Sequence, residues 1–208
     1  SIVLTDYILK KIKLSKSINT KQNEYHPCPN EDGSKLFFVG MDRSGNYSTK
    51  IDFTKTRNAG GEDIWVSTLK HGVYTEAIPL TSINDNSHQS VTSFINNELL
   101  LYGLYDEAYK VDASGTNSEW YNGDIFTYNL EQDKMTHLGQ PINDFLFESD
   151  AFISSDNKIL IFVTDKNPTG SYNQKGFNFN GSFWGNTDIW ISEKIEDYWT
   201  QPINMGEV

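Results

Sequence analysis

The chain has 208 residues, enough for one large or two small domains with a sizeable buried core. Its 28 acidic residues outnumber its 17 Lys and Arg residues and give a formal net charge of −11, so a nucleic-acid partner, which needs a basic face, is not expected. The single cysteine, Cys28, excludes an internal disulfide and a cysteine-based metal site, and no apolar run reaches the roughly 18 residues of a membrane span.

Apolar runs and turn residues divide the chain into repeating units. Residues 2–4 and 7–14 are predicted to be the last two strands of an earlier unit, which ends at SINT, residues 17–20. The lysines around these strands suit the solvated side of an edge strand. We therefore expect residues 1–20 to be the end of a preceding unit.

Residues 21–85 are predicted to form the first complete unit, with four strands called a, b, c and d. Strand a lies near residues 25–29, and a turn rich in Asn, Asp and Gly joins it to the apolar strand b at 35–40. Strand c carries Asp63-Ile64-Trp65, and strand d runs over 73–81 into the sequence SIND. The turn residues favour a hairpin-linked sheet.

The same order of features returns in residues 86–144 and 145–208. The Asp-Ile-aromatic triplet recurs at spacings of 61 and 64 positions, and each later strand d runs into an Ile-Asn pair, in PIND and in PINM. Four-stranded units repeated at more than about 40 residues are typical of β-propeller blades. The sequence thus predicts an all-β protein, a partial β-propeller of four-stranded antiparallel blades with about three and a half blades present.

Several short motifs of the first unit recur in register and carry a family resemblance. They are Glu24 and Pro27, then residues 30–38, 60–65 and 83–85. The third unit matches at Glu148 and at residues 154–158, 188–190 and 202–204. The second unit departs from the pattern, with Gln89 for the Glu, Asn96-Asn97 for Asp-Gly, and Phe126 for Trp.

Over about residues 17–208, this pattern resembles the WD40-like repeat of TolB-type β-propellers. The resemblance implies a protein of the bacterial cell envelope, in the periplasm, at the outer membrane or secreted. Such repeats mostly serve without catalysis, often beside peptidoglycan-binding or helical-repeat domains. A protein or cell-wall glycan is therefore the expected partner.

The repeated Asp-Ile-aromatic triplet is interpreted mainly as scaffold. In a strand, Ile64 faces one side while Asp63 and Trp65 face the other, and both faces of a blade are covered by neighbours. We expect each Asp to accept hydrogen bonds from the glycine-rich backbone that precedes it.

Three blades do not close a ring, since propellers have roughly four to eight. The missing blades are expected from the rest of a longer chain, the favoured interpretation, or from another subunit. In either case the terminal strands would be open edges.

The connections between strands b and c are the longest in each unit. They cover about residues 42–62, 105–123 and 165–187, and loops longer than about 12 to 15 residues are usually functional or disordered. Propeller topology brings them to one face, where aromatics among Asn, Gly and Ser suit a protein- or glycan-binding surface. The predicted ligand-binding residues are Tyr47, Tyr105, Tyr109, Trp120, Tyr121, Tyr172, Phe177, Phe183 and Trp184. The alternative, that these aromatics fold back onto the blades, stays open.

A second candidate site is formed by Glu24, Gln89 and Glu148, each six residues after the Ile of an Ile-Asn pair. Because the three residues have the same position in the repeat, their side chains would lie at one level at the mouth of an axial channel. A ring of acceptors there could hold a cation or a basic segment. In the alternative interpretation, each side chain bonds to the backbone of the next blade.

Catalytic motifs are absent from the sequence: it has no GxSxG elbow, no HExxH and no phosphate-binding glycine loop. No two of the four histidines have metal-ligand spacing, although His26 and His88 lie near the start of strand a, where the third unit has Asp150. The Asp-rich turns lack the alternating carboxylates of a calcium loop. We therefore expect no catalytic residue, no metal and no cofactor.

Three functional hypotheses remain. The favoured one is a non-catalytic binding or scaffolding propeller that recognises its partner through the long b–c connections. The second is an enzyme, either a propeller that gates a peptidase or a glycan-active hydrolase with axial carboxylates. The third is a structural subunit whose blades are completed by another chain.

Overall fold

The computed structural model describes most of the chain as antiparallel strands. The described residues are 14–47, 61–85, 89–103, 123–144, 146–166, 177–179, 182–184 and 187–206, with 177–179 and 182–184 described as backbone. Within these ranges the structure contains strands and turns and no helix. No segment in them could therefore cross a membrane as a long apolar helix.

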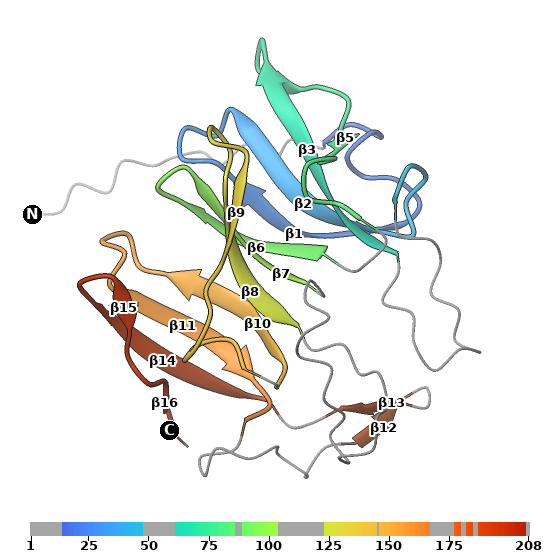
Figure 1. Ribbon diagram of the computed structural model, residues 1–208. Helices are drawn as coiled ribbons and strands as arrows, with labels where there is room; N and C mark the ends of the chain where they lie inside the picture. The colour runs from blue at the N-terminus through green and yellow to red at the C-terminus, as the bar shows by residue number, and fades with distance from the viewer. Residues whose placement is uncertain are drawn as a thin grey trace, which may run out of the picture.

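The strands form three similar sheets, which we call blade 1, blade 2 and blade 3 (Figure 1). Blade 1 contains β1 (Asn23–Pro29), β2 (Lys35–Met41), β3 (Glu62–Lys70), β4 (Val73–Tyr74) and β5 (Ile78–Pro79). Blade 2 contains β6 (Gln89–Ile95), β7 (Glu98–Gly103), β8 (Asp124–Asn129) and β9 (Lys134–His137). Blade 3 contains β10 (Glu148–Ile153), β11 (Ile159–Thr164), β14 (Asp188–Ile195), β15 (Tyr198–Trp199) and β16 (Ile203–Asn204). A separate hairpin pairs β12 (Phe177–Phe179) with β13 (Ser182–Trp184).

Each blade has strands a, b, c and d in sequence order, and all neighbours are antiparallel. Tight turns with a left-handed backbone make this order possible. In blade 2, Asn96 and Asn97 have φ values of 48° and 64° between β6 and β7, the signature of a two-residue type I′ hairpin turn. Asparagine tolerates this backbone region better than most residues, so the sequence places the turn correctly.

The outer strand d is interrupted in blades 1 and 3, whereas the sequence predicted one continuous strand. In blade 1, Thr75 lies between β4 and β5 and bonds to β3: its carbonyl accepts the Ser67 hydroxyl at 2.6 Å, and its side chain accepts the Thr68 amide. Thr200 makes the same two bonds in blade 3, to Ser192 and Glu193. The side-chain bonds replace part of the backbone ladder, which explains the two short pieces.

The blades pack face to face, and alternation along each strand separates two apolar faces. We call the face toward the following blade the far face and the opposite one the near face. The far face of blade 1 (Cys28, Phe37, Val39 and Ile64) packs on the near face of blade 2 (Val91, Leu99, Leu101, Phe126 and Tyr128). The far face of blade 2 (Leu100 and Ile125) packs on the near face of blade 3 (Ala151, Ile153, Leu160, Phe162 and Trp190).

The repeated Ile-Asn pair forms the same turn before each of the three blades. The amides of Ile18, Ile83 and Ile142 donate to a carbonyl three residues earlier, and the following Asn amides donate to that same carbonyl. All three Ile side chains are buried: Ile83 and Ile142 lie in the interfaces between blades, and Ile18 packs on the near face of blade 1. The Ile-Asn pair in SINT, residues 17–20, is therefore structurally equivalent to the pairs Ile83-Asn84 and Ile142-Asn143.

The prediction that Ile203-Asn204 is equivalent to the earlier Ile-Asn pairs is wrong, because Ile203 comes five residues before the equivalent position in the repeat. Ile203 pairs with Ile191 in β16, just as Ile78 pairs with Val66 in β5. The Met205 amide then donates to the Ile189 carbonyl, as the Leu80 amide donates to the Ile64 carbonyl. Met205 thus holds the position of Leu80, three residues before the true Ile-Asn position.

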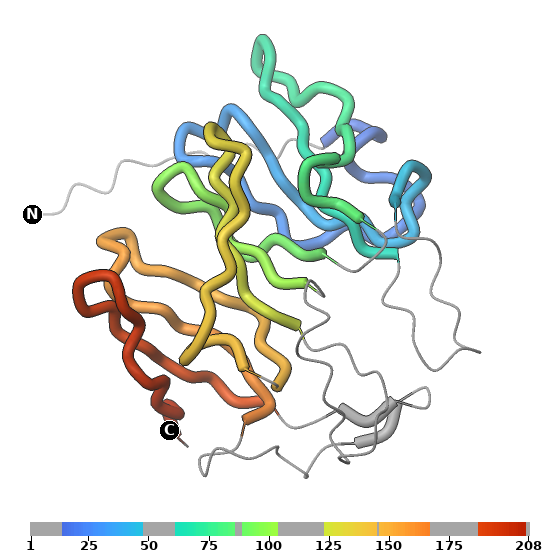
Figure 2. The backbone as a smooth tube through the Cα atoms, viewed as in Figure 1, coloured from blue at the N-terminus to red at the C-terminus, as the bar shows by residue number. Residues whose placement is uncertain are grey.

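The chain is an all-β partial propeller of antiparallel blades, as predicted. Figure 2 shows the three sheets following one another from blue to red in sequence order, with the innermost strands β1, β6 and β10 next to one another. The expected half blade falls on residues 1–20, of which 1–13 lie outside the described residues.

Candidate functional site

The b–c connections leave all three blades at the same end. In each blade the last residue of strand b pairs with the first of strand c: Met41 with Glu62, Gly103 with Asp124, and Thr164 with Asp188. In Figure 1 these strand ends lie to the right of the tight a–b turns of the same blades. We call the end with the long connections the b–c end.

Most of the predicted aromatic ligand-binding residues fall outside the described residues or are described as backbone. Tyr105, Tyr109, Trp120, Tyr121 and Tyr172 lie outside. Phe177, Phe183 and Trp184 lie on the β12–β13 hairpin, in which Phe177 pairs with Trp184 and Asn178 with Phe183. The sequence interpretation missed this hairpin, although Asn180-Gly181 between two Phe-rich runs is a strong hairpin signal.

Tyr47 is the aromatic residue of this set whose side chain is described, and 46% of it is exposed. Its backbone amide donates to Oδ2 of the buried Asp63 at 2.6 Å. The first Asp of the repeated triplet therefore fixes the start of a b–c connection.

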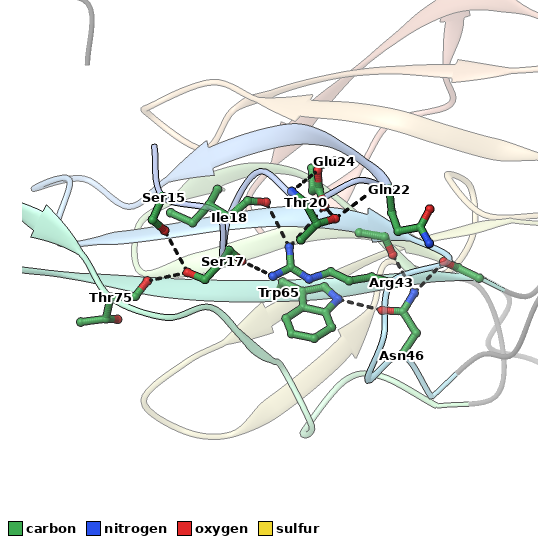
Figure 3. Close-up of polar contacts among 12 residues, drawn as sticks. Ser15, Ser17, Ile18, Thr20, Gln22, Glu24, Arg43, Asn46, Trp65 and Thr75 are labelled. Carbon is green, nitrogen blue, oxygen red and sulfur yellow. Dashed lines mark hydrogen bonds and ion pairs between the residues drawn. The ribbon is translucent and has the colours of Figure 1, made fainter. Parts of the chain in front are cut away.

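Arg43 anchors the base of this connection to the turn that precedes blade 1 (Figure 3). Its guanidinium donates to the Ile18 carbonyl at 3.1 Å and to the Ser17 carbonyl, and it lies 3.5 Å from Glu24. The guanidinium carbon is 4.1 Å from the centre of the Trp65 ring, a cation–π distance. Burial lowers the Arg43 pKa, while the Glu24 charge raises it.

Asn46 completes this base with three hydrogen bonds (Figure 3). Its Nδ2 donates to the carbonyls of Gly40 and Gly61, both at 2.7 Å, and its Oδ1 accepts the Trp65 indole N–H at 2.8 Å. One side chain thus joins the end of β2, the residue before β3 and the aromatic of the repeated triplet. The connection starts from a fixed base, and Tyr47 comes directly after it.

Glu24, Gln89 and Glu148 occupy the same position at the start of strand a, and each makes a local hydrogen bond. Each accepts a backbone amide four residues earlier, from Thr20 at 3.1 Å, Asp85 at 3.4 Å and Asp144 at 3.4 Å. The bond is local, to the segment that enters the same blade, whereas the alternative interpretation expected a bond to the next blade. The ring of acceptors stays a prediction. These side chains hold the entrance of each blade in place.

Glu148 is buried near three aspartates. Burial, followed by the charges of Asp144, Asp124 and Asp165, raises its pKa well above the ordinary value. Burial also raises the pKa of Asp165 to about 6, although its Oδ1 accepts the Phe147 amide at 3.1 Å. Lys166 offsets part of this charge with a 2.8 Å ion pair to Asp144.

The other two repeated aspartates are held by strand d. Asp124 is buried and lies 3.3 Å from Nε2 of His137, whose Nδ1 accepts the Gly139 amide. Asp188 accepts Nδ2 of Asn204 at 3.0 Å. The aspartates therefore serve the scaffold, each with a partner inside its own blade.

A polar cluster joins all three blades where their innermost strands meet. Nδ1 of His26 on β1 lies 3.0 Å from the Ser90 hydroxyl on β6, and Nε2 lies 3.9 Å from Asp150 on β10. His26 and Asp150 occupy the irregular positions of β1 and β10, both with positive φ, which turns them out of the regular ladder. The sequence suggested this correspondence, and the structure brings the two residues together.

Two tyrosines and one carboxylate extend this cluster. The Tyr25 hydroxyl donates to Glu62, and burial followed by that bond raises the Tyr25 pKa. Burial also raises the pKa of Glu62 and brings the pKa of Tyr102 to about 12. Tyr25 and Glu62 belong to blade 1 and Tyr102 belongs to blade 2, so these groups suit a polar contact between the two blades.

Ser90, His26 and Asp150 are the three residue types of a nucleophilic triad, but their geometry does not fit one. Ser90 is fully buried, so its hydroxyl does not reach a substrate, whereas His26 and Asp150 are partly exposed. Within the described ranges, no group of three or more His, Cys, Asp or Glu side chains is arranged to hold a metal ion.

Arg43 and Asn46 were not foreseen from the sequence. Both lie in a stretch of polar residues after strand b that lacks a counterpart in the other units, so the repeat gave no signal for them. A buried Arg needs several acceptors at once, and these come from residues 17, 18 and 24, which are distant in the chain.

Comparisons with known proteins place the chain only loosely. No protein-family model matches the sequence, and no curated protein matches it. Among solved structures, the chain is similar to the crystal structure of TolB from Acinetobacter baumannii, with 10% identity and a TM-score of 0.40. The match covers 83% of this chain and 41% of that one, so the chain spans less than half of the length of that structure.

Proposed function

We propose that the chain belongs to a non-catalytic binding β-propeller of the bacterial cell envelope, which recognises a protein or cell-wall glycan partner at the b–c end. The observation that carries the proposal is the common direction of the three pairs of strand ends, 41 with 62, 103 with 124, and 164 with 188. Long connections on a regular scaffold are common places for binding residues, and here three of them leave the blades at one end.

The base of the first connection supports this role. Arg43 and Asn46 fix the backbone on both sides of it, and Tyr47 extends an exposed ring from that base. A rigid support lowers the entropy lost when a partner is bound, and Tyr suits recognition because it combines a large apolar ring with a hydroxyl.

The chemistry of the described residues favours binding over catalysis. Glu148 and Gln89 are buried and locally bonded, and Ser90 is inaccessible. A glycosidase needs two carboxylates that face a substrate from opposite sides, and the equivalent positions at the start of strand a hold two Glu and one Gln with local partners. The envelope location is supported by the resemblance of the repeats to TolB-type propellers.

Replacing the b–c connections tests the proposal. In the test variant, residues 48–60, 104–122 and 167–186 are each replaced by a short Gly-Ser turn. Its control is Glu131→Ala with Gln132→Ala, in the c–d turn at the opposite end of blade 2. Binding is measured by co-sedimentation with purified peptidoglycan sacculi and by affinity capture from a bacterial envelope extract, after circular dichroism has confirmed folding.

We expect the test variant to keep its sheet signal and lose binding, while the control binds like the unchanged chain. Binding that survives removal of all three connections would contradict the proposed function. Equal loss in the control would place the binding surface at the other end of the blades.

A further inference from the structure

The three blades treat one equivalent position on strand b in three different ways. Gly40, Gly103 and Thr164 are equivalent, because each pairs with the repeated Asp of strand c and with the Glu or Gln at the start of strand a. Residues directly opposite each other in a sheet share one face. The three positions therefore mark the same place on the near face of each blade, at the b–c end.

In blade 1, the side chain of Arg43 occupies this place (Figure 3). A Cβ atom at Gly40 would lie 2.9 Å from Cδ of Arg43 and 2.9 Å from the Trp65 ring. The guanidinium lies on the Trp65 ring, 3.5 Å from Glu24, and it donates to the carbonyls of the turn that precedes the blade. The glycine thus makes room for a bound guanidinium.

In blade 3, a side chain of strand b itself takes this place. The Thr164 hydroxyl donates to Glu148 at 3.4 Å and accepts the Lys166 amide at 3.2 Å. Glu148 is the equivalent of Glu24. A threonine at this strand position is therefore compatible with the fold of a blade.

In blade 2, a small pocket lies beside Gly103. Five of the residues that line it correspond to residues around Arg43 in blade 1, as strand pairing and the preceding turn show. Ile83, Gln89, Leu101, Phe126 and Met135 correspond to Ile18, Glu24, Phe38, Trp65 and Ala77. The pocket is thus the counterpart of the place that a guanidinium holds in blade 1.

A buried carboxylate lies next to this pocket. Asp124 pairs with Gly103, so the two residues share the near face of blade 2. Its Oδ2 lies 3.3 Å from Nε2 of His137, whereas its Oδ1 makes no hydrogen bond within the described part of the chain. Asp124 is 98% buried, since its exposed fraction is 2%. A buried acceptor of this kind favours a donor that carries positive charge.

The turn before blade 2 supplies further acceptors. The amides of Ile83 and Asn84 donate to the Leu80 carbonyl, exactly the bonds that Ile18 and Asn19 make to Ser15. The turn therefore brings the carbonyls of residues 82 and 83 to the place of those that bind Arg43 in blade 1. Phe126 offers an aromatic face where blade 1 has Trp65.

We propose that the pocket beside Gly103 binds the guanidinium of an arginine side chain from a protein partner. This inference rests on the proposed function and narrows its partner to a protein with an exposed arginine. A guanidinium stacks on aromatic rings, is weakly hydrated and donates several hydrogen bonds in one plane, which suits Phe126, Asp124 and the turn carbonyls. The formal net charge of −11 favours the approach of a cationic segment.

The test titrates the isotope-labelled chain with N-acetyl-arginine methylamide and follows the backbone amide signals by NMR. The citrulline compound has nearly the same shape without the charge, and the lysine compound carries an ammonium group. Gly103→Thr fills the pocket as Thr164 does in blade 3. Gln89→Glu introduces the carboxylate that Glu24 provides in blade 1.

We expect saturable shifts at the amides of Ile83, Gly103 and Phe126, with the arginine compound bound at least tenfold more tightly than the citrulline compound. Gly103→Thr should weaken arginine binding at least tenfold, and Gln89→Glu should tighten it at least threefold. Equal affinities for the two compounds, shifts located elsewhere, or an unchanged affinity in either variant that folds would overturn the proposal. If Gly103→Thr does not fold, Gln89→Glu decides alone.

Two other occupants give different results. Equally tight binding of the lysine compound would show a site for any cation and would overturn the assignment to arginine. Residues 104–122 contain one basic residue, Lys110. If Lys110→Ala tightens arginine binding at least tenfold, the chain's own lysine competes for the pocket, and this result would also overturn the proposal.

Partner capture is measured separately, so the two proposals can fail independently. Capture that depends on the b–c connections, together with no binding of the arginine compound, would overturn this inference and leave the proposed function standing. Capture that survives removal of the connections would contradict the proposed function, whatever the pocket binds.

Discussion

In blade 2, Ile125 is fully buried and the Asn143 side chain holds its backbone, whereas in blade 3 the equivalent Ile189 is half exposed. Asn143 accepts the Ile125 amide at 2.9 Å and donates to its carbonyl at 2.8 Å. Asn84 makes the same pair of bonds to Ile64 in blade 1. Blades 2 and 3 share a sequence motif, but the burial of that motif depends on whether another blade covers the far face.

This comparison shows that the Ile-Asn pair connects one blade to the next. The Asn side chain bonds to the preceding blade, and the Ile, which comes four or five residues after strand d, enters the interface with the next blade. Ile203-Asn204 has the same two letters but lies within strand d itself. The stabilising role therefore belongs to the position in the repeat and not to the residue pair alone.

The largest effect is expected from truncating the equivalent isoleucines. Ile125→Ala removes a side chain that is covered on all sides, and it should lower the free energy of unfolding by about 2 to 5 kcal/mol. Ile189→Ala removes a half-exposed side chain and should cost less than about 1 kcal/mol. Urea denaturation of both variants measures the difference, and equal losses would break the comparison between the blades.

Substitution of the Asn residues of the two Ile-Asn pairs tests the same comparison between blades 2 and 3. Asn143→Ala leaves the buried amide and carbonyl of Ile125 without their side-chain partner, which should cost about 2 to 3 kcal/mol. Asn204→Ala breaks a bond to the partly exposed Asp188 and should cost about 1 kcal/mol or less. Thermal unfolding of the two variants is the measurement. A larger loss of stability for Asn204→Ala than for Asn143→Ala would contradict the conclusion that Asn143, and not Asn204, connects two blades.

A smaller, pH-dependent effect is expected at Asp165, where blade 1 has Met41 at the equivalent position. Burial raises the Asp165 pKa from 3.8 to about 6 in the folded protein. Its contribution to stability is therefore complete below about pH 4 and is lost as the pH rises through 6. Asp165→Asn keeps an acceptor for the Phe147 amide, so it should stabilise the protein by about 1 to 2 kcal/mol at pH 7 and change little at pH 4.

Denaturation of Asp165→Asn and the unchanged chain at pH 4 and pH 7 checks this sign. Met41→Leu in blade 1, which carries no titratable group, is the matched control and should show no pH-dependent difference. Destabilisation of Asp165→Asn at pH 7 would mean that the ionised carboxylate is favourable at this site.

The smallest effect on stability is expected at the b–c end. Tyr47→Ala removes a side chain that is nearly half exposed, while its backbone bond to Asp63 remains. The free energy of unfolding should change by no more than about 0.5 kcal/mol. Asp63→Ala, in contrast, should lower it clearly, because a buried acceptor of the Tyr47 amide is lost. The same denaturation series tests both variants.

The sequence revealed the strands because local turn residues and apolar runs set them. Asn96-Asn97 marked a hairpin, and the Asp-Ile-aromatic triplets marked strand c in all three blades. The position of residues within strand d was harder to predict. Ile203-Asn204 has the same sequence as the earlier Ile-Asn pairs, but the pairing of Ile203 with Ile191 places it inside strand d.

The site was less predictable, because its contacts join residues that are far apart in the chain. The equal phase of Glu24 and Glu148 was visible, but their bonds to the amides of Thr20 and Asp144 were not. His26 and Asp150 meet only after three blades have packed in order. Arg43 depends on carbonyls from the preceding turn, which no local pattern announces.

Photo-crosslinking from the two ends of the blades tests the central claim most directly. Benzoylphenylalanine replaces Tyr47 at the b–c end in one variant and Ser155 in an a–b turn in the other, both at sites with exposed surface. Each variant is irradiated in a bacterial envelope extract and with purified peptidoglycan fragments. The account predicts crosslinked products from position 47 and none from position 155. Crosslinking from position 155 alone, or equally from both positions, would contradict it.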